Sequence, residues 1–450
     1  MIFSSITFLF LYLPVTFIVY ILLPNLKLKN LFLTIASLLF YAWGEPIYVF
    51  LMLISVFFNW KIGLLLEKKP NVKLVILAVI LNIGLLFYFK YYSFFIELLN
   101  LVPFINLSIP QIRLPIGISF FTFQALSYVI DISRGHCMAQ KSYFNLLLYI
   151  SLFPQLIAGP IVKYYDIDKQ ILNRKLSNVS EGIQRFIYGL SKKVLIANNM
   201  AFIADTIFAI HPSELNIIST WVGAIAYLFQ IYFDFSGYSD MAIGLGKMFG
   251  FEFRENFNYP LSAISIKDFW RRWHISLSTW FKEYLYIPLG GNRNGARRTY
   301  VNQMIVFLAT GLWHGANLTF LVWGIFHGIF LILETKNIIP IEKIRSKTIK
   351  HLYTLLVVTL LFVIFRADNL LYAVEYIKQM FTGFNMNNLV YQLINPYIIL
   401  ITIIAVCISF KSSIITNIMK SNYILTMVLL FFSVLSLASN SYNPFIYFRF

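Results

Sequence analysis

The sequence predicts an all-α protein that crosses a membrane many times, and two observations lead to this prediction. Hydrophobic residues make up 59% of the 450 residues and charged residues only 12%, whereas soluble domains carry about 25% charged residues. Apolar runs of the roughly 20 residues that a helix needs to cross a bilayer recur along the whole chain. We therefore expect about 10–12 transmembrane helices, with additional re-entrant or interfacial helices and no soluble domain.

The candidate spans follow one another from the first residues to the last. They are Phe3–Leu23, Leu31–Trp43, Ile47–Leu66, Val72–Leu99, Ile116–Ile130, Tyr143–Ile161, Ile183–Ile210, Trp221–Phe249, Val301–Leu333, Thr354–Phe365, Tyr397–Phe410 and Ile424–Leu437. Leu31–Trp43 and Ile116–Ile130 are short for simple spans. The first run has no charged region before it and no small-residue cleavage site, so we expect a retained span and not a signal peptide.

The basic residues favour a membrane topology signal over nucleic-acid binding. The net charge is +17, and pairs such as Lys27 and Lys29 or Lys192 and Lys193 are expected in short loops between apolar runs. Cationic loops orient membrane proteins and contact anionic headgroups. The two cysteines, Cys137 and Cys407, have no metal-ligand spacing, so we expect neither a metal site nor a disulfide framework.

The stretch Glu252–Tyr300 interrupts the apolar pattern. It mixes cations such as Arg271 and Arg272 with aromatic residues such as Trp273 and Trp280. A lipid-facing span cannot carry that charge, and a soluble loop does not need so many aromatic side chains. The composition predicts a re-entrant or interfacial segment that lies against protein.

His314 is the sharpest candidate for chemistry, because it lies within the mostly apolar run Val301–Leu333. Polar residues at membrane depth are costly and mark functional sites, and imidazole exchanges a proton near neutral pH. Asn317, three residues later, is expected on the same helical face. The pair suits a base beside an amide that holds a carbonyl oxygen, and it equally suits a histidine that only packs between helices.

The other polar candidates are weaker. Counting residues places His327 on the opposite helical face from His314, bonded elsewhere, and His274 serves either the site or the anchoring of its amphipathic segment. Asp234 and Asp240 enclose Ser236 and Tyr238. Two carboxylates at membrane depth need partners, which the basic segment Lys267–Arg272 can supply. Asp234 and Asp240 form either a polar wall of the site or, as we favour, a buried charge network that fixes a broken helix.

The chain ends in an unusual aromatic tail, so we divide it into residues 1–440, the transmembrane domain, and residues 441–450, the tail that carries Tyr447. The last residues read Asn443-Pro-Phe-Ile-Tyr-Phe-Arg-Phe450, whereas terminal tails are usually polar and frayed. Such a tail either docks in an interfacial aromatic belt or inserts into a cavity and presents Tyr447.

Six motifs in order make the chain resemble the membrane-bound O-acyltransferase family, most closely its bacterial branch of alginate and peptidoglycan O-acetylation subunits and teichoic-acid D-alanyl transfer proteins. The motifs are Phe121-Thr-Phe-Gln-Ala-Leu-Ser-Tyr-Val-Ile-Asp131, Phe153-Pro-Gln-Leu-Ile-Ala-Gly-Pro160, Phe233-Asp-Phe-Ser-Gly-Tyr-Ser-Asp240, Asp268-Phe-Trp-Arg-Arg-Trp-His-Ile-Ser-Leu-Ser-Thr-Trp280, Tyr286-Ile-Pro-Leu-Gly-Gly-Asn-Arg293 and Trp313-His-Gly-Ala-Asn317. Lys163 and Asn198 depart from the family pattern, which has an arginine and an acid at these positions.

The resemblance implies the family's fold and assigns roles to residues. His314 becomes the catalytic histidine, His274 the second family histidine, and Tyr447 a covalent acyl carrier. The substrate-binding candidates are Trp313, Asn317, Ser236, Tyr238 and Arg271.

The resemblance also implies the reaction. A cytoplasmic thioester, acetyl-CoA, is expected to donate an acetyl group that crosses the membrane as a Tyr447 ester, with no bound cofactor. The expected partners are an extracytoplasmic serine-nucleophile (SGNH-like) acetyltransferase, a cell-envelope polysaccharide and the lipid bilayer, with no nucleic acid. The abundance of Ile, Lys and Asn indicates an AT-rich genome, which favours peptidoglycan as acceptor over an alginate-like polysaccharide. The expected location is the inner membrane of a bacterium. The alternative is a transporter or flippase of an envelope precursor.

Overall fold

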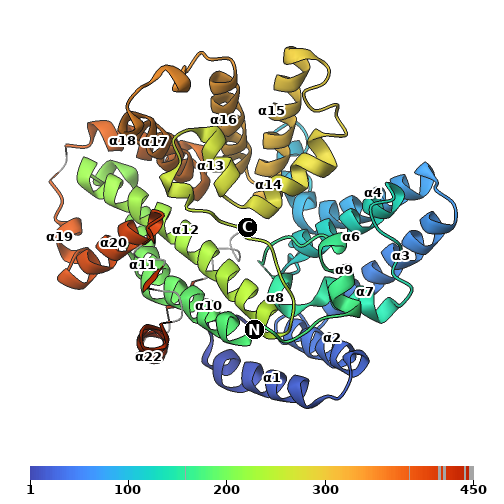
Figure 1. The fold of residues 1–450 in the computed structure, drawn as a ribbon. Coiled ribbons are helices and arrows are strands. Elements are labelled where there is room, and N and C mark those ends of the chain that lie inside the picture. Colours follow the sequence, from blue (N-terminus) through green and yellow to red (C-terminus); the bar gives the residue numbers. More distant parts are fainter. Residues whose placement is uncertain (158, 385, 414–416, 419–421, 440–441, 445–450) are drawn as a thin grey trace. The chain divides into compact units, whose positions relative to one another are not determined.

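The computed structural model is built of helices throughout the part of the chain that it describes (Figure 1). It describes all residues except 158, 385, 414–416, 419–421, 440–441 and 445–450. The predicted all-α class is confirmed. Contacts divide the chain into one unit of Met1–Phe186 with Ser239–Arg254 and a second of Ile187–Tyr238 with Glu255–Phe450.

The first unit contains the N-terminal helices. They are η1 (Phe8–Tyr12), α1 (Leu13–Leu22), α2 (Leu26–Ala42), α3 (Tyr48–Lys68), α4 (Val72–Leu86), η2 (Phe87–Tyr91), α5 (Tyr92–Leu99), α6 (Ile118–Ser133), α7 (Tyr143–Ser151), α8 (Phe153–Leu156), α9 (Tyr164–Leu172) and most of α10 (Val179–Ser191). Gly63 of α3 lies against the Tyr128 ring of α6, where a Cβ atom would come within 2.8 Å of that ring.

The second unit carries the residues that the sequence singled out. Its helices are η3 (Lys192–Ala197), α11 (Asn198–Phe208), η4 (Pro212–Glu214), most of α12 (Ile217–Met248), η5 (Pro260–Ser262), α13 (Ile266–Arg272), α14 (Ile275–Phe281), η6 (Lys282–Tyr286), α15 (Gly295–His314), α16 (Leu318–Thr335), η7 (Ile341–Lys343), α17 (Lys347–Arg366), α18 (Leu370–Thr382), α19 (Leu389–Leu393), α20 (Pro396–Ser409) and α22 (Tyr423–Ser439).

Several helices have the length and apolar composition of membrane spans. Among the described residues five qualify, which are Tyr48–Lys68, Val72–Leu99, Ile217–Met248, Leu318–Thr335 and Lys347–Arg366. Four shorter apolar helices accompany them, at Phe8–Leu22, Ile118–Ser133, Pro396–Ser409 and Tyr423–Ser439. The apolar runs of the sequence therefore become helices, although several are shorter than a bilayer is thick.

The hydrophobicity of Val301–Leu333 predicts one helix, but the structure forms a helical hairpin there. α15 ends at His314 and α16 begins at Leu318, and the two lie side by side (Figure 1). Gly311 approaches the carbonyl oxygen of Phe320, and Gly324 approaches that of Phe307, so closely that a Cβ atom would overlap the oxygen in each case. Glycines thus permit the contact that folds the run back on itself.

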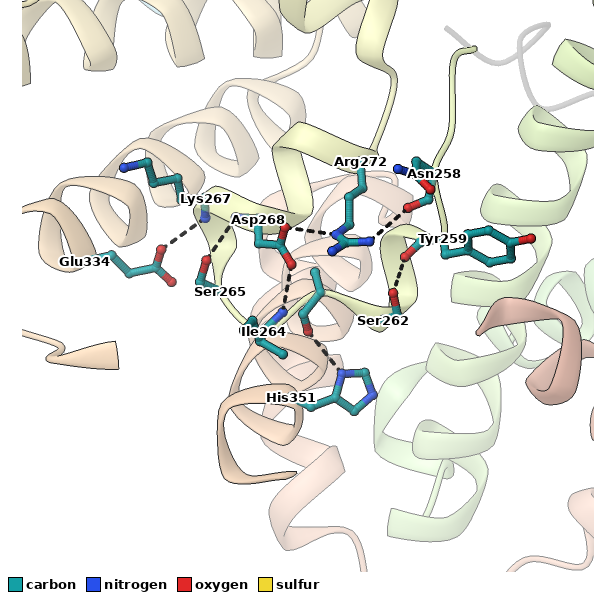
Figure 2. A network of polar contacts seen from close by, with 11 residues as sticks. Asn258, Tyr259, Ser262, Ile264, Ser265, Lys267, Asp268, Arg272, Glu334 and His351 are labelled. Atoms are coloured by element: carbon teal, nitrogen blue, oxygen red, sulfur yellow. Dashed lines mark hydrogen bonds and ion pairs between the residues drawn. The ribbon is translucent and has the colours of Figure 1, made fainter. Parts of the chain in front are cut away.

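The amphipathic stretch 252–300 lies against protein, as its composition predicts. It forms α13 and α14, and its aromatic residues Trp273 and Trp280 are buried while Arg271 is exposed. Figure 2 shows the contacts that hold the N-terminus of α13. The Glu334 carboxylate of α16 accepts the backbone N–H groups of Ile266 and Lys267 at 2.7 and 3.0 Å.

Two further contacts of this network are visible in Figure 2. The His351 ring of α17 donates through Nδ1 to the carbonyl of Ala263 at 3.0 Å, and Arg272 pairs with Asp268 at 2.9 Å. Carboxylates near a helix N-terminus stabilise it through the free N–H groups and the helix dipole. Helices α16 and α17 therefore fix the position of α13, and through it the position of His274 at the start of α14.

Candidate active site

His314 is enclosed by aromatic rings at the point where the α15–α16 hairpin turns. It is the last residue of α15 and is 6% exposed. Its ring lies 5.0 Å from Trp313, 5.2 Å from Trp323 of α16 and 5.2 Å from Phe365 of α17, all nearly perpendicular. An imidazole among edge-to-face rings is held in a fixed orientation and shielded from bulk water, which suits a proton acceptor in acyl transfer.

His274 belongs to the same group of rings. The Trp313 ring that contacts His314 also lies 5.8 Å from His274, and Phe235 of α12 lies 4.5 Å from it. His274 is fully buried and has a left-handed backbone with φ 43°. A non-glycine residue in that region is strained by about 1–3 kcal/mol, a cost that occurs most often at functional sites.

Hydrogen bonds define the protonation of His274. The Asn256 Oδ1 atom accepts from the Ser276 N–H at 3.1 Å and the Ser276 hydroxyl at 2.9 Å, and it lies 3.2 Å from His274 Nδ1. An amide oxygen is only an acceptor, so Nδ1 carries the hydrogen and Nε2 keeps a lone pair. Burial lowers the pKa of His274 to about 3, so the ring is neutral near pH 7.

His327 joins this group of rings although counting residues separates it from His314. Its ring is 4.8 Å from Trp323, which contacts His314, and its Nδ1 accepts from Trp270 Nε1 at 3.2 Å. The helical-face argument is wrong because the helix ends between the two histidines. We call His274, Trp313, His314, Trp323 and His327 the histidine cluster.

Asn317 does not share a helical face with His314, because α15 ends before it. It is the N-cap of α16. Its Oδ1 accepts from the Thr319 N–H at 3.0 Å, and its Nδ2 donates to the Asp368 carbonyl at 3.1 Å. The Asn317 amide therefore caps the N-terminus of α16 and holds the turn between the two helices. The observed geometry therefore gives Asn317 a structural task beside the catalytic candidate.

In α12 Asp234 is buried and Asp240 is partly exposed, and the ionic partners of both differ from those predicted. Asp234 pairs with Lys193 at 2.8 Å, with both side chains no more than 3% exposed, and Asp240 pairs with Arg185 at 2.7 Å. The expectation that Lys267–Arg272 supplies these partners is wrong. Lys193 is also not a loop residue, since it lies within the helical turn η3.

The substrate-binding candidates of the sequence are placed differently from one another. Trp313 lies between the two histidines. Ser236 and Tyr238 are 3% and 2% exposed in α12, close in sequence to Phe235, which contacts His274. Arg271 is exposed on α13.

Three residues before Tyr447 are fixed to the second unit. The Tyr442 hydroxyl donates to Asp205 Oδ2 at 2.6 Å, Asn198 Nδ2 donates to Asn443 Oδ1 at 3.2 Å, and Lys193 donates to the carbonyl of Pro444. Asp205 also binds Arg366 at 2.6 Å. We call Lys193, Asn198, Asp205 and Arg366, with residues 442–444, the tail anchor. Tyr447 itself lies outside the described residues.

Sequence reasoning missed the residues that link these two groups. Arg366 of the tail anchor follows Phe365, whose ring contacts His314. Asp205 and Lys193 are separated from their partners by long stretches of chain, and no local spacing announces them. The requirement that a buried carboxylate has a partner was the one available signal, and it left the partner unspecified.

The fold and the histidine cluster define the class of protein, a helical membrane protein with a buried histidine site. The profile of the membrane-bound O-acyltransferase family matches residues 82–374. The chain belongs to this family and is a multi-pass membrane acyltransferase. This membership favours acyl transfer over the alternative of a transporter or flippase.

Curated relatives carry related names. The chain is 43% identical to a Pseudomonas putida protein named probable alginate O-acetylase AlgI, over 85% of this chain and 80% of the relative. It is 39% identical to the peptidoglycan O-acetyltransferase of Helicobacter pylori, over 84% of this chain and 80% of the relative. It is 30% identical to the teichoic acid D-alanyltransferase of Bacillus subtilis, over 48% of this chain and 58% of the relative.

Proposed function

We propose that this protein moves an acetyl group from cytoplasmic acetyl-CoA across the inner membrane of a bacterium, as an ester on Tyr447, for O-acetylation of a cell-envelope polysaccharide. Relatives named for alginate and peptidoglycan O-acetylation support the acceptor class. Peptidoglycan is the acceptor that we favour, and an alginate-like polysaccharide comes second.

The observation that carries the proposal is the connection between the tail anchor and the histidine cluster. Tyr442 binds Asp205, Asp205 binds Arg366, and the neighbouring Phe365 contacts His314. Tyr447 is five residues beyond Tyr442, and five extended residues span at most roughly 17 Å. A short tether raises the effective concentration of the group that it carries, and this supports Tyr447 as the acyl carrier.

The chemistry balances without a bound cofactor. His314 takes the phenol proton of Tyr447, the phenolate oxygen attacks the thioester carbonyl carbon, and the C–S bond breaks. The thiolate of CoA leaves with the proton that His314 holds. The pKa of the leaving group rises from a thiol, about 8.5, to a phenol, about 10, and rises much further to an alkyl alcohol, so a phenyl ester keeps much of the transfer potential of the thioester.

The second transfer requires a partner outside the cytoplasm. A serine hydroxyl of an SGNH-like acetyltransferase attacks the Tyr447 ester, takes the acetyl group and passes it to a sugar hydroxyl. The phenol is regenerated, so the tail is a carrier and is not consumed.

Mass spectrometry of the C-terminal peptide tests the proposal directly. Purified protein is incubated with acetyl-CoA, and wild type is compared with His314→Ala, Tyr447→Phe and the control His211→Ala, whose side chain is 63% exposed. We expect an acetyl ester on Tyr447 in wild type and the control, and none in the other two. A fully observed tail without adduct in wild type would refute the tyrosine relay.

The acceptor is tested by adding the glycan. Wild-type protein with its serine-nucleophile partner is supplied with purified peptidoglycan or with alginate, and O-acetyl groups are measured on each. We expect acetylation of peptidoglycan alone. Acetylation of alginate alone would contradict our preference for peptidoglycan as the acceptor.

A further inference from the structure

Helix α16 carries two buried ring N–H groups, on Trp323 and His327, and the Trp323 ring contacts the catalytic candidate His314. The two residues are 1% and 0% exposed. They are one helical turn apart, their rings are 4.8 Å from each other, and the Trp323 ring is 5.2 Å from that of His314. Residues four apart share one helical face, so α16 presents both rings on one face, where Trp323 meets the end of α15.

The protonation of His327 follows from its one hydrogen bond. Trp270 Nε1 lies 3.2 Å from His327 Nδ1, and an indole nitrogen is only a donor. His327 Nδ1 therefore holds a lone pair, and in the neutral ring the hydrogen is on Nε2. The rings of Phe269 and Phe307 lie nearly parallel to the His327 ring, with interplanar angles of 6° and 18°, which fixes the plane of the ring.

Neither N–H group reaches an acceptor within the described part of the chain. Trp323 Nε1 and His327 Nε2 are both buried without a hydrogen-bond partner there. Buried donors without acceptors are rare because their desolvation is not compensated. The rings that carry these two donors are in contact with each other, and one of them contacts the ring of His314. This arrangement indicates that the missing acceptor belongs to a ligand.

The ligand chemistry follows from the surroundings. Both donors are neutral and enclosed by aromatic rings, which disfavours a fully charged group such as phosphate. A carbonyl oxygen accepts two hydrogen bonds, is neutral in the ground state and gains negative charge when its carbon is attacked. Neutral donors aimed at such an oxygen stabilise the transition state more than the ground state.

We propose that Trp323 and His327 bind the carbonyl oxygen of the acyl thioester and stabilise the oxyanion formed during its attack, with Trp270 as the positioning residue that fixes the His327 tautomer. This assignment rests on the proposed function. The attacking oxygen forms its bond to the carbonyl carbon, the C=O electron pair moves to the oxygen facing the two N–H groups, and it returns when the C–S bond breaks.

The first test is kinetic and uses tryptophan-to-phenylalanine changes, which remove the N–H group and keep an aromatic ring. We expect Trp323→Phe to lower kcat for Tyr447 acetylation about 10²–10³-fold with little change in KM. Trp270→Phe is expected to lower kcat less, because the His327 hydrogen is then free to occupy either nitrogen. The control is Trp221→Phe, which removes the Trp221 bond to the Met380 carbonyl at 2.9 Å and is expected to keep wild-type kcat.

The second test separates a bond to the acyl group from a general packing role. Acetyl-CoA labelled with ¹³C at the carbonyl is bound to His314→Ala protein, which is expected not to turn over, and the carbonyl stretch is measured by isotope-edited infrared spectroscopy. We expect a frequency below that of free acetyl-CoA, and a return towards the free value when Trp323→Phe is added.

The outcomes distinguish the two proposals. An unchanged carbonyl frequency in Trp323→Phe, with acetyl-CoA still bound, would overturn the donor assignment and leave the proposed function intact; a buried water then satisfies these N–H groups. Protein that binds no acetyl-CoA at all would refute the donor in the proposed function, and the assignment would fall with it.

Discussion

The histidine cluster and the tail anchor lie in the same unit of the protein and are built from opposite kinds of interaction. In the histidine cluster, His314 contacts the rings of Trp313, Trp323 and Phe365. In the tail anchor, Asp205 binds Arg366 at 2.6 Å, and Lys193 binds Asp234 at 2.8 Å.

The two kinds of interaction match the tasks of the two regions. A base that removes a proton must be stable in its neutral form, and apolar burial favours neutral imidazole. A segment that must stay in one place is better held by charged hydrogen bonds, which are stronger and more directional than neutral ones. Loss of a charge should therefore damage the tail anchor through stability, whereas changes in the histidine cluster should act through geometry or protonation.

The largest effect on stability is expected for Lys193→Met, because it leaves Asp234 buried without its ionic partner. Removing one member of a buried pair costs roughly 3–5 kcal/mol, and thermal unfolding in detergent measures the loss. The control is Lys247→Met, which breaks the ion pair with Glu181. The Lys247 side chain is 25% exposed and that of Glu181 67%, so we expect this change to cost about 0–1 kcal/mol. An equal loss of stability in the two variants would show that burial of the ion pair does not make it more important for stability.

The next effect is expected in the hairpin that positions His314. Gly311→Ala adds a methyl group against the backbone oxygen of Phe320, so α15 and α16 must separate, at a cost of about 1–3 kcal/mol. Acyl transfer should fall with stability because His314 moves. Gly84→Ala in α4 meets nothing within 4 Å and should instead stabilise its helix by up to about 1 kcal/mol. Full activity in Gly311→Ala would show that the close helix contact does not set the site.

A smaller effect on stability, with a specific local consequence, is expected for Asp205→Asn. The change removes the charge that binds both Arg366 and Tyr442. Because Asp205 is 30% exposed, we expect a loss of about 1–2 kcal/mol, at the low end for charged hydrogen bonds. Carboxypeptidase digestion followed by mass spectrometry should show faster removal of the last residues. Asp268→Asn, which breaks the pair with Arg272 instead, should leave that rate unchanged.

The effect that is smallest near neutral pH is a pH dependence in the histidine cluster. The pKa of His274 is lowered from 6.5 to about 3 by burial, so between these values the unfolded chain binds a proton that the folded protein does not. Stability should therefore be complete above pH 6.5 and fall as the pH drops towards 3, with the unfolding constant rising up to tenfold per pH unit from this group.

Comparison of variants isolates this contribution from the other acids that titrate in the same range. Unfolding midpoints of wild type, His274→Asn and the exposed control His211→Asn are measured from pH 7 to pH 4. We expect a shallower fall only for His274→Asn. Parallel curves for all three proteins would mean that His274 is not held neutral by burial.

Much of this protein was determined by its sequence. The apolar runs and the scarcity of charge specify a helical membrane protein, and the amphipathic stretch around Trp273 and Arg271 is predicted to lie against protein. His314 stands out because a titratable group within an apolar run is costly. These features are local, since each depends on composition or on a few neighbouring residues.

Which side chains meet depends on how the helices turn and pack. Helical periodicity predicts shared faces only while the helix continues, and α15 ends at His314 because the chain turns at Gly315, where a Cβ atom would overlap the Phe320 ring. Asn317 is therefore the N-cap of α16, and the Trp323 ring contacts both His314 and His327. The partner of Asp234 was likewise decided in space, because a buried charge requires an opposite charge nearby but places no condition on where in the sequence that charge lies.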